Sequence, residues 1–322
     1  MGYWIIGLYH PKPNFGYSHD LPASTLTCTA IDMLSYRHAF HAGNHADVLK
    51  HFILIQLIRH LQQKDNPFWY IDSHAGAGLY ALDTGYATKL AEHVEGIDRL
   101  WSCSDLPAAL AEYVGLVRAL NPDGKLRNYP GSPWIANQLL RAQDRLCLFE
   151  LHSRDSQLLQ ENFRATGRRA TVHASDGFAG LKALLPPPPR RALVLIDPAY
   201  EDKQDYRRVP QILAEGLKRF ATGIYAIWYP QLPEKHGRTT VQRNESKQLP
   251  EKLKTLAVKN WLHVRLTVGT PAADAFGMYG SGMFIFNPPW TLAGTLQQVM
   301  PYLVQALGQD AGASFLVEQA VD

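Results

Sequence analysis

Apolar positions near the start of the chain first follow helical spacing and then group into short β-prone runs. Eight apolar side chains between Asp47 and Leu61 recur every three or four residues, and Asn66-Pro67 ends this segment. The next run, Phe68–Asp72, is apolar and enters a turn of small residues, Ser73–Gly78. This order predicts an amphipathic helix, a buried strand and a tight turn.

The second half of the chain alternates between strand-like and helix-like segments. Strand-like runs occupy about 145–151, 170–174, 192–197, 223–229, 262–268 and 282–287, and helix-like runs occupy about 153–164, 178–184, 206–220 and 246–260. Strands that alternate with helices require a mostly parallel sheet that is covered on both faces. The pattern therefore predicts an α/β protein with a doubly wound, Rossmann-like sheet.

A mostly helical stretch separates the first strand from the next acid that ends a strand. In a doubly wound sheet, a glycine-containing turn after the first strand, such as Ser73–Gly78, can bind a nucleotide-like ligand. Such a site needs an acid about 20 residues after the turn, but Glu92 and Glu95 lie in a helical segment. The first acid in a suitable place is Glu150, directly after a strand-like run. We therefore expect a small helical insertion subdomain beside the ligand crevice.

These boundaries divide the chain into four parts. Residues 1–32 are rich in Pro, Gly, Ser and Thr and precede a second methionine, Met33. We expect them to be an extension, either outside the core or packed on it as an arm. The sheet domain comprises 33–79 and 145–305, the insertion 80–144, and a C-terminal tail 306–322.

Polar residues end four successive strands of the predicted sheet. They are Asp72 with His74, Glu150, Asp176 before Gly177, and Asp197. The carboxyl ends of parallel strands meet at one edge, where open α/β sheets bind their ligands, and Gly76 and Gly78 let the backbone approach a ligand closely. This order favours a class I methyltransferase that uses S-adenosylmethionine.

The last of these acids belongs to the segment Asp197-Pro198-Ala199-Tyr200, which follows a run of four apolar residues. Asp197 and a neighbouring backbone carbonyl can accept hydrogen bonds from a planar amine, while Tyr200 can stack on its ring. Methylation of a nucleobase amino group needs this chemistry. Read alone, the segment is better explained as a strand end followed by a turn, because proline stops a ladder and aspartate favours turns.

A similar string, Asn287-Pro288-Pro289-Trp290, closes the last predicted strand. It lies far from the strand that carries the glycine turn, and two prolines at this point would simply end a strand. We therefore interpret it as structural.

The composition limits the classes of protein that are possible. The chain has 322 residues, 46% hydrophobic content, a net charge of +3 and a pI near 8.6, which permits a nucleic-acid partner without requiring one. No apolar run reaches the roughly 20 residues that cross a bilayer, so no membrane association is expected. Three widely spaced cysteines argue against a disulfide framework and favour the cytoplasm.

Three histidines, His38, His41 and His45, recur at spacings of three and four. One interpretation is a zinc site on a helix, but Gly43-Asn44 interrupts the helix and methyl transfer from a sulfonium needs no metal, so we expect none. A second interpretation places these histidines at the mouth of the site with Tyr36 and Arg37, in contact with nucleic acid or cofactor. The third is a purely structural role.

Several long segments closely resemble the RlmJ family of bacterial methyltransferases, which modify adenine N6 in 23S ribosomal RNA. The matching segments are Met33–His51, Asp72–Gly78, Tyr129–Pro133 and Arg219–Pro230, and the resemblance runs from Met33 to about Trp290. It implies a Rossmann-like methyltransferase domain with a small helical insertion and S-adenosylmethionine as the cofactor. The implied substrate is 23S RNA, protein-free or early in assembly, methylated at adenine 2030.

The resemblance also assigns roles to individual residues. It implies that His51, His74, Ser132, Glu150, Asp176 and Gly177 contact the cofactor, with Lys50 within reach and Gly76 in the turn. Asp197 would be the catalytic acceptor, with Pro198 and Tyr200 beside it, and Tyr36 would touch the RNA, joined by Arg37, His38 and His41 at the mouth. The family usually has a second proline where this chain has Ala199, which loses a constraint on φ. We still expect activity.

Two other functions stay open at this stage. The Asp-Pro-x-Tyr chemistry would also serve a DNA adenine methyltransferase. A nucleic-acid-binding protein without catalysis, for example one that handles external DNA, would use the same basic residues. No obligate protein partner is evident from the sequence.

Overall fold

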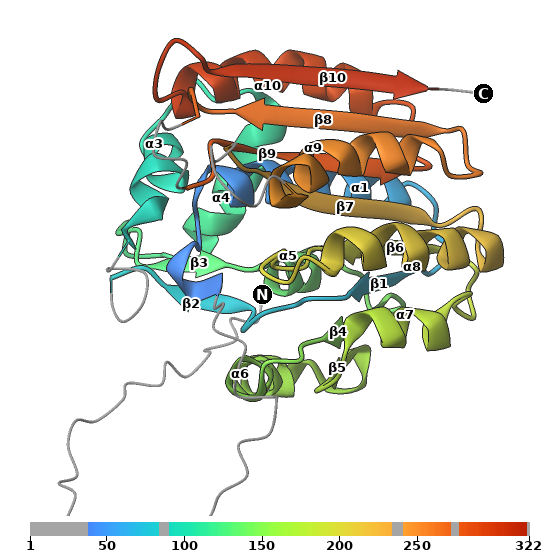
Figure 1. Ribbon diagram of the computed structural model, residues 1–322. Coiled ribbons are helices and arrows are strands. Elements are labelled where there is room, and N and C mark those ends of the chain that lie inside the picture. The colour runs from blue at the N-terminus through green and yellow to red at the C-terminus, as the bar shows by residue number, and fades with distance from the viewer. Residues whose placement is uncertain (1–37, 84–89, 234–240, 272–276, 321–322) are drawn as a thin grey trace, which may run out of the picture. The chain divides into compact units, whose positions relative to one another are not determined.

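A computed structural model describes residues 38–83, 90–233, 241–271 and 277–320. The expected extension, 1–32, lies outside these residues, as do Tyr36 and Arg37. An eight-stranded sheet forms the centre of the described part (Figure 1). From edge to edge the strands are β10 (Ser314–Ala320), β8 (Trp261–Thr267), β9 (Gly280–Phe286), β7 (Ile224–Gln231), β6 (Ala192–Ile196), β1 (Trp69–Asp72), β4 (Arg145–Phe149) and β5 (Ala170–His173).

The strand order creates a switch point beside β1. The chain passes from β1 to β4 and β5 on one side and then returns to β6 on the other, and these strands are parallel, as is β7. The adjacent loops therefore diverge above the carboxyl ends of β1 and β6, where such sheets bind ligands. The register places Asp72 beside Leu195, two residues before Asp197.

The sheet has a separate core on each face. All five residues of β6 are buried, and they alternate between the two cores: Leu193 and Leu195 face one, and Ala192, Val194 and Ile196 face the other. A strand without polar alternation is therefore a strand covered on both sides.

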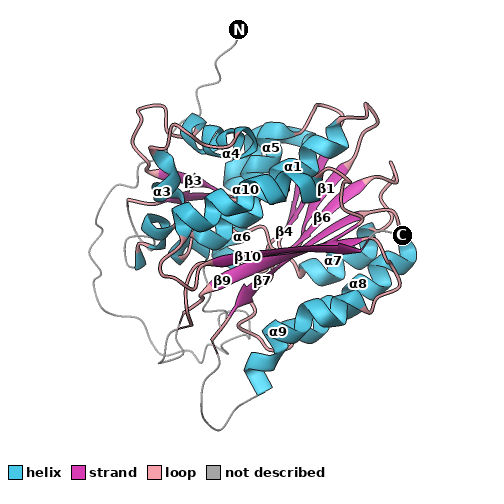
Figure 2. Ribbon diagram, turned by 90° about the horizontal axis from the view of Figure 1, so that it is seen from above, coloured by secondary structure: helices cyan, strands magenta, loops and turns pink. Residues whose placement is uncertain are grey.

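Helices from distant parts of the chain cover these two faces (Figure 2). One face carries α1 (His45–Gln62), α4 (Ala108–Ala119), α5 (Ser132–Leu139) and α10 (Leu292–Leu307), and the other carries α7 (Gly177–Leu184), α8 (Asp205–Arg219) and α9 (Val241–Lys254). None of the helices in these ranges has an apolar stretch long enough to cross a membrane.

The start of α1 is fixed by side-chain capping. The Oδ1 atom of Asn44 accepts hydrogen bonds from the backbone N–H groups of Ala46 and Asp47, both at 3.0 Å. Gly43, with φ of 82°, supplies the left-handed turn just before the cap. This cap directs the first turns of α1, with Lys50 and His51, toward the carboxyl edge of the sheet.

The stretch between β1 and β4 contains more than the helical insertion that we expected. It comprises β2 (Leu79–Ala81), η3 (Glu92–Glu95), α3 (Ile97–Trp101), α4, β3 (Asn128–Pro130) and α5, and β2 pairs with β3 in a small antiparallel sheet. Because α5 packs on α1, β1 and β4, it is the helix that covers the sheet between its first two strands. The remaining short elements are η2 (His38–Phe40), α6 (Ser153–Phe163) and η4 (Arg164–Arg169).

The expected C-terminal tail is wrong for most of its length. Residues 314–320 form β10, which pairs antiparallel with β8 at the edge of the sheet. Phe315 and Val317 pack against the core, so this strand covers apolar surface that would otherwise be open to solvent.

The structural interpretation of Asn287 is confirmed by the direction of β9. This strand runs antiparallel to β7, and Phe286 lies beside Tyr225 at the amino-terminal end of β7. Asn287 therefore lies near the amino-terminal end of β7, whereas Asp197 lies at the carboxyl end of β6. The Asn287 amide donates to the carbonyls of Ala221 and Gly223, both at 2.7 Å.

Alanine substitution should change the free energy of unfolding in opposite directions at two glycines between β1 and β4. A Cβ atom on Gly96 would lie 2.0 Å from the carbonyl oxygen of Gly43, whereas one on Gly115, inside α4, would meet nothing within 4 Å. Gly96→Ala should lower the free energy of unfolding by about 1–3 kcal/mol through overpacking. Gly115→Ala should raise it by about 0.5–1 kcal/mol, because alanine is the better helix former. Urea denaturation measures both free energies of unfolding. An unchanged stability of Gly96→Ala would contradict the close approach of Gly96 to Gly43.

Candidate active site

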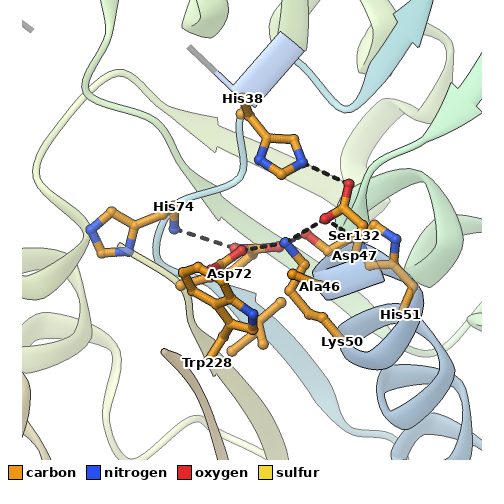
Figure 3. A network of polar contacts seen from close by, with 12 residues as sticks. His38, Ala46, Asp47, Lys50, His51, Asp72, His74, Ser132 and Trp228 are labelled. Atoms are coloured by element: carbon orange, nitrogen blue, oxygen red, sulfur yellow. Dashed lines mark hydrogen bonds and ion pairs between the residues drawn. The ribbon is translucent and has the colours of Figure 1, made fainter. Parts of the chain in front are cut away.

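A buried lysine joins two carboxylates at the carboxyl edge of the sheet (Figure 3). Lys50, from α1, places its Nζ atom 2.5 Å from Oδ2 of Asp197 and 2.9 Å from Oδ1 of Asp47. Asp197 follows β6 directly, so the contact links the helix to the end of a central strand. The structure thus brings Lys50 and Asp197 together.

The positive charge of Lys50 stabilises both carboxylates of this cluster. Burial raises the pKa of Asp197 to about 6, and the positive charge of Lys50 opposes that rise. Burial alone would lower the pKa of Lys50, but Asp197 and Asp47 outweigh it and raise the pKa above its ordinary value. Burial would raise the pKa of Asp47, yet His38 and Lys50 hold it well below its usual range. At neutral pH the lysine is therefore charged and both carboxylates are ionised.

The three closely spaced histidines, His38, His41 and His45, have different surroundings. His38 donates from Nε2 to Oδ2 of Asp47 at 2.9 Å, and Nδ1 of His41 lies 2.9 Å from Oε1 of Glu92. His45 is buried in the first turn of α1, where desolvation lowers its pKa to about 4. Within the described ranges, no His, Cys, Asp or Glu side chains form a cluster of three that could hold a metal ion.

Asp72, at the end of β1, is fully buried and accepts three hydrogen bonds. Its Oδ2 atom accepts from the hydroxyls of Tyr70 at 2.6 Å and Ser132 at 2.7 Å, and Oδ1 accepts from the backbone N–H of His74 at 3.2 Å. Ser132 is the first residue of α5, after the N-cap position at Gly131. Its hydroxyl ties α5 to the first strand.

Glu150, after β4, accepts a hydrogen bond from the turn after β1. The backbone N–H of Gly76, with φ of 60°, donates to Oε2 of Glu150 at 2.8 Å, and the N–H of His152 donates to Oε1 at 2.7 Å. Burial raises the pKa of Glu150 to about 7 in spite of these two donors. Glu150 is therefore a carboxylate that is poised to change its charge near neutral pH.

The end of β5 lies against the same turn. A Cβ atom on Gly177 would sit 1.9 Å from the carbonyl oxygen of Ser73, so only glycine allows α7 to begin here. Asp176 caps α7 by accepting from the N–H of Phe178 at 2.8 Å, and it forms an ion pair with Arg208 of α8. The ring of His74 packs edge-on to Phe178, with 4.9 Å between the ring centroids.

Tyr200 adopts an unusual backbone conformation and is largely covered. Its φ is 56°, in the left-handed region that non-glycine residues rarely adopt and that clusters at functional sites. Its hydroxyl donates to the carbonyl of Trp228 at 2.8 Å, its ring lies 4.6 Å from that of Tyr206, and only 6% of the residue is exposed. A base could stack on Tyr200 only after neighbouring atoms move.

Two charged residues of this site were not predicted from the sequence. Asp47 lies three residues before Lys50, a spacing that aligns opposite charges on a helix and could have revealed it. Arg208 pairs with Asp176 and lies over the ring of Phe178, 4.4 Å from its centroid. Arg208 and Asp176 are 32 positions apart in the chain, which leaves no local sequence signal for that pair.

The fold and the ordered acids define a Rossmann-like methyltransferase: a mostly parallel sheet in which β9 and β10 run opposite to the other strands, a glycine turn after β1, and acids after β1, β4, β5 and β6. The family model described as ribosomal RNA large subunit methyltransferase D, RlmJ, matches residues 65–318. The chain belongs to this family.

Individual relatives agree with this assignment. The chain is 49% identical over 271 residues to ribosomal RNA large subunit methyltransferase J of Escherichia coli (84% of this chain, 93% of that protein). It is 46% identical over 287 residues to the protein of the same name from Haemophilus influenzae (89% and 98%). A crystal structure of a protein from Legionella pneumophila superposes with a TM-score of 0.77 at 33% identity, covering 87% of this chain and 98% of that one.

The lysine contact leads to a prediction about the charge of Asp197. In a Lys50→Met variant, the buried carboxylate loses its compensating charge, so its pKa should rise above 6 by about one unit or more. Carboxyl-carbon NMR titration measures this value directly. Lys64→Met, which removes an exposed lysine just after α1, is the control and should leave it unchanged. A pKa of Asp197 that stays the same or falls in Lys50→Met would contradict the proposed coupling.

Proposed function

We propose that this protein transfers a methyl group from S-adenosylmethionine to N6 of an adenine in 23S ribosomal RNA, at adenine 2030 as the family resemblance implies. The observation that carries the proposal is Asp197, a buried carboxylate that Lys50 keeps ionised at the carboxyl end of a central strand. Membership in a family of ribosomal RNA methyltransferases supports the choice of substrate. The cytoplasm, where ribosomes are assembled, is the proposed place of action.

The residues around the turn after β1 fit the proposed cofactor. Glu150, held by two backbone N–H groups, suits the hydroxyls of a ribose, and Asp176 with Gly177 suits the amine end of an adenine ring. His74, Ser132, Lys50 and Gly76 line the same edge. His51 adds a buried Nε2 atom without a hydrogen-bond partner in the described part of the chain. When bound, the sulfonium of S-adenosylmethionine supplies an electrophilic methyl group.

Asp197 is the proposed acceptor for the adenine amine. Lys50 contacts its Oδ2 atom, so Oδ1 is the atom that we expect to accept a hydrogen bond from N6. The backbone carbonyl of Pro198 would accept the second N–H. Together they would increase the electron density on nitrogen and align it for in-line transfer, with positioning as the main source of rate.

The adenine must leave its stack to reach Asp197, as enzymes that modify bases within a duplex require. Tyr200 would then stack on the base, which needs a rearrangement of its present surroundings. Tyr36, Arg37, His38 and His41 are the proposed RNA contacts. His38 already binds the Asp47 carboxylate, so it would connect RNA binding to the charged cluster.

Replacement of the acceptor tests the proposed chemistry. Asp197→Asn keeps the shape of the side chain but removes its negative charge, so methyl transfer should fall by about 10²-fold or more while S-adenosylmethionine still binds. Asp202→Asn, which changes an exposed carboxylate five residues further along the chain, is the control and should leave methyl transfer unchanged.

A radiolabelled transfer assay that compares deproteinised 23S RNA with duplex DNA is the measurement. Full activity in Asp197→Asn would contradict the role of Asp197. Preferential labelling of DNA by the wild-type protein would favour a DNA methyltransferase. Cofactor-independent nucleic-acid binding, without transfer to either substrate, would favour a non-catalytic role.

The charge of Glu150 predicts a pH dependence of cofactor binding. If only the ionised carboxylate binds the ribose, a pKa of about 7 gives roughly tenfold weaker binding at pH 6 than at pH 8. Isothermal titration calorimetry at both pH values measures the change. Glu150→Gln should bind weakly and without this pH dependence, whereas Glu161→Gln, at an exposed position on α6, should behave like the wild type. Equal affinity of the wild type at both pH values would contradict the role of Glu150.

A further inference from the structure

Three buried side chains from three separate elements form a hydrogen-bonded chain behind the charged cluster. The hydroxyl of Tyr113, on α4, lies 2.9 Å from the hydroxyl of Tyr129, on β3, which lies 2.8 Å from Nδ1 of His51, on α1. All three residues are at most 1% exposed. The three side chains are therefore shielded from bulk solvent.

His51 is neutral, so its tautomer decides which hydrogen bonds it can make. Burial lowers the pKa of its imidazole to about 3, against the opposing effect of Asp47. A neutral imidazole carries one proton, either on Nδ1 or on Nε2. Tyr129 contacts Nδ1, while Nε2 is fully buried and has no hydrogen-bond partner among the residues that the structure describes.

The hydrogen-bonded chain can run in either of two directions, and each direction leaves one buried donor without an acceptor in the described part of the protein. If Nδ1 carried the proton, it would donate to Tyr129, Tyr129 would donate to Tyr113, and the Tyr113 proton would have no acceptor in the described ranges. In the reverse arrangement, Tyr113 donates to Tyr129 and Tyr129 donates to an unprotonated Nδ1. Every hydroxyl proton is then satisfied, and the unmet donor is Nε2–H of His51, which lies near Asp47.

The Asp47 carboxylate favours the second arrangement, in which Nε2 carries the proton. Its Oδ1 atom lies 3.9 Å from Nε2 of His51, beyond hydrogen-bond length but close enough for a strong electrostatic effect. A lone pair on Nε2 would face this negative charge, whereas an N–H dipole would be attracted to it.

We propose that Tyr113 and Tyr129 hold His51 in the Nε2–H tautomer, so that the segment between β2 and β3 sets a hydrogen-bond donor of the active site. The tyrosines are positioning residues, since they act through His51. This inference deepens the proposed function and rests on it for the identity of the acceptor, an anionic or carbonyl oxygen of S-adenosylmethionine. The tautomer itself does not depend on that assignment.

Nitrogen NMR on protein labelled with ¹⁵N-histidine tests the tautomer without any ligand. A two-bond proton–nitrogen spectrum distinguishes protonated from unprotonated ring nitrogens, and the signals of His51 are assigned by their loss in His51→Gln. We expect an unprotonated Nδ1 and a protonated Nε2 in the wild type. A protonated Nδ1 overturns the proposal.

Variants of the two tyrosines test the consequence for binding. Tyr129→Phe removes the donor to Nδ1, so the spectrum should show both tautomers, and S-adenosylhomocysteine should bind about five- to tenfold more weakly. Tyr113→Phe leaves Tyr129 in place and should weaken S-adenosylhomocysteine binding by about two- to threefold. Tyr225→Phe removes a buried hydroxyl that donates to the Phe220 carbonyl at 3.0 Å, away from the site, and is the matched control for folding.

The outcomes separate this inference from the proposed function. Unchanged affinity and an unchanged tautomer in Tyr129→Phe, with that variant folded as well as Tyr225→Phe, overturn the positioning role. If the wild type has the Nε2–H tautomer but binds neither S-adenosylmethionine nor S-adenosylhomocysteine, the proposed function fails and the tautomer assignment stands.

Discussion

The buried contact of Lys50 with Asp47 and Asp197 is the constraint on which the site depends. A carboxylate cannot stay ionised in the protein interior without a partner, and removal of one member of a buried pair is far more costly than loss of a surface ion pair. One lysine here compensates two acids, and His38 adds a further donor to Asp47. The orientation of α1 over the sheet is thereby coupled to the chemistry at the end of β6.

This coupling explains why the start of α1 is so strictly organised. Asn44 caps the helix through Oδ1 and also donates from its amide to Glu92, which in turn contacts His41. Gly43 accepts a hydrogen bond from the N–H of Ile97 at 2.8 Å, so the segment before α1 and the segment after β2 position each other. A small displacement at this point would move Lys50 relative to Asp197.

Much of the fold could be predicted because it follows from local pattern. Apolar runs gave the strands, and the first acid in a suitable place, Glu150, identified a long segment between the first two strands of the sheet. The strand β10 was missed because its apolar residues are only half-buried at an edge, where the alternation is weak. The site was harder to predict, since Lys50 and Asp197 are 147 residues apart and only the folded chain reveals their contact. The role of Ser132 was likewise hidden, because its hydroxyl can cap a helix or bind Asp72, and the sequence does not distinguish the two.

The segment between β2 and β3 leaves the sheet domain and returns to it at almost the same point. The N–H of Gly131 donates to the carbonyl of Gly78 at 2.9 Å, and the N–H of Leu82 donates to the carbonyl of Arg127 at 2.7 Å, so both ends are clamped together. A loop whose ends already touch can change in length at little entropic cost, because closure entropy grows only slowly with length. Changes in the length of this segment that keep both clamps would therefore cost little entropy. Tyr113, Glu92 and Ile97, which contact residues on or next to α1 directly or through Tyr129, are among the points at which such variation would meet resistance.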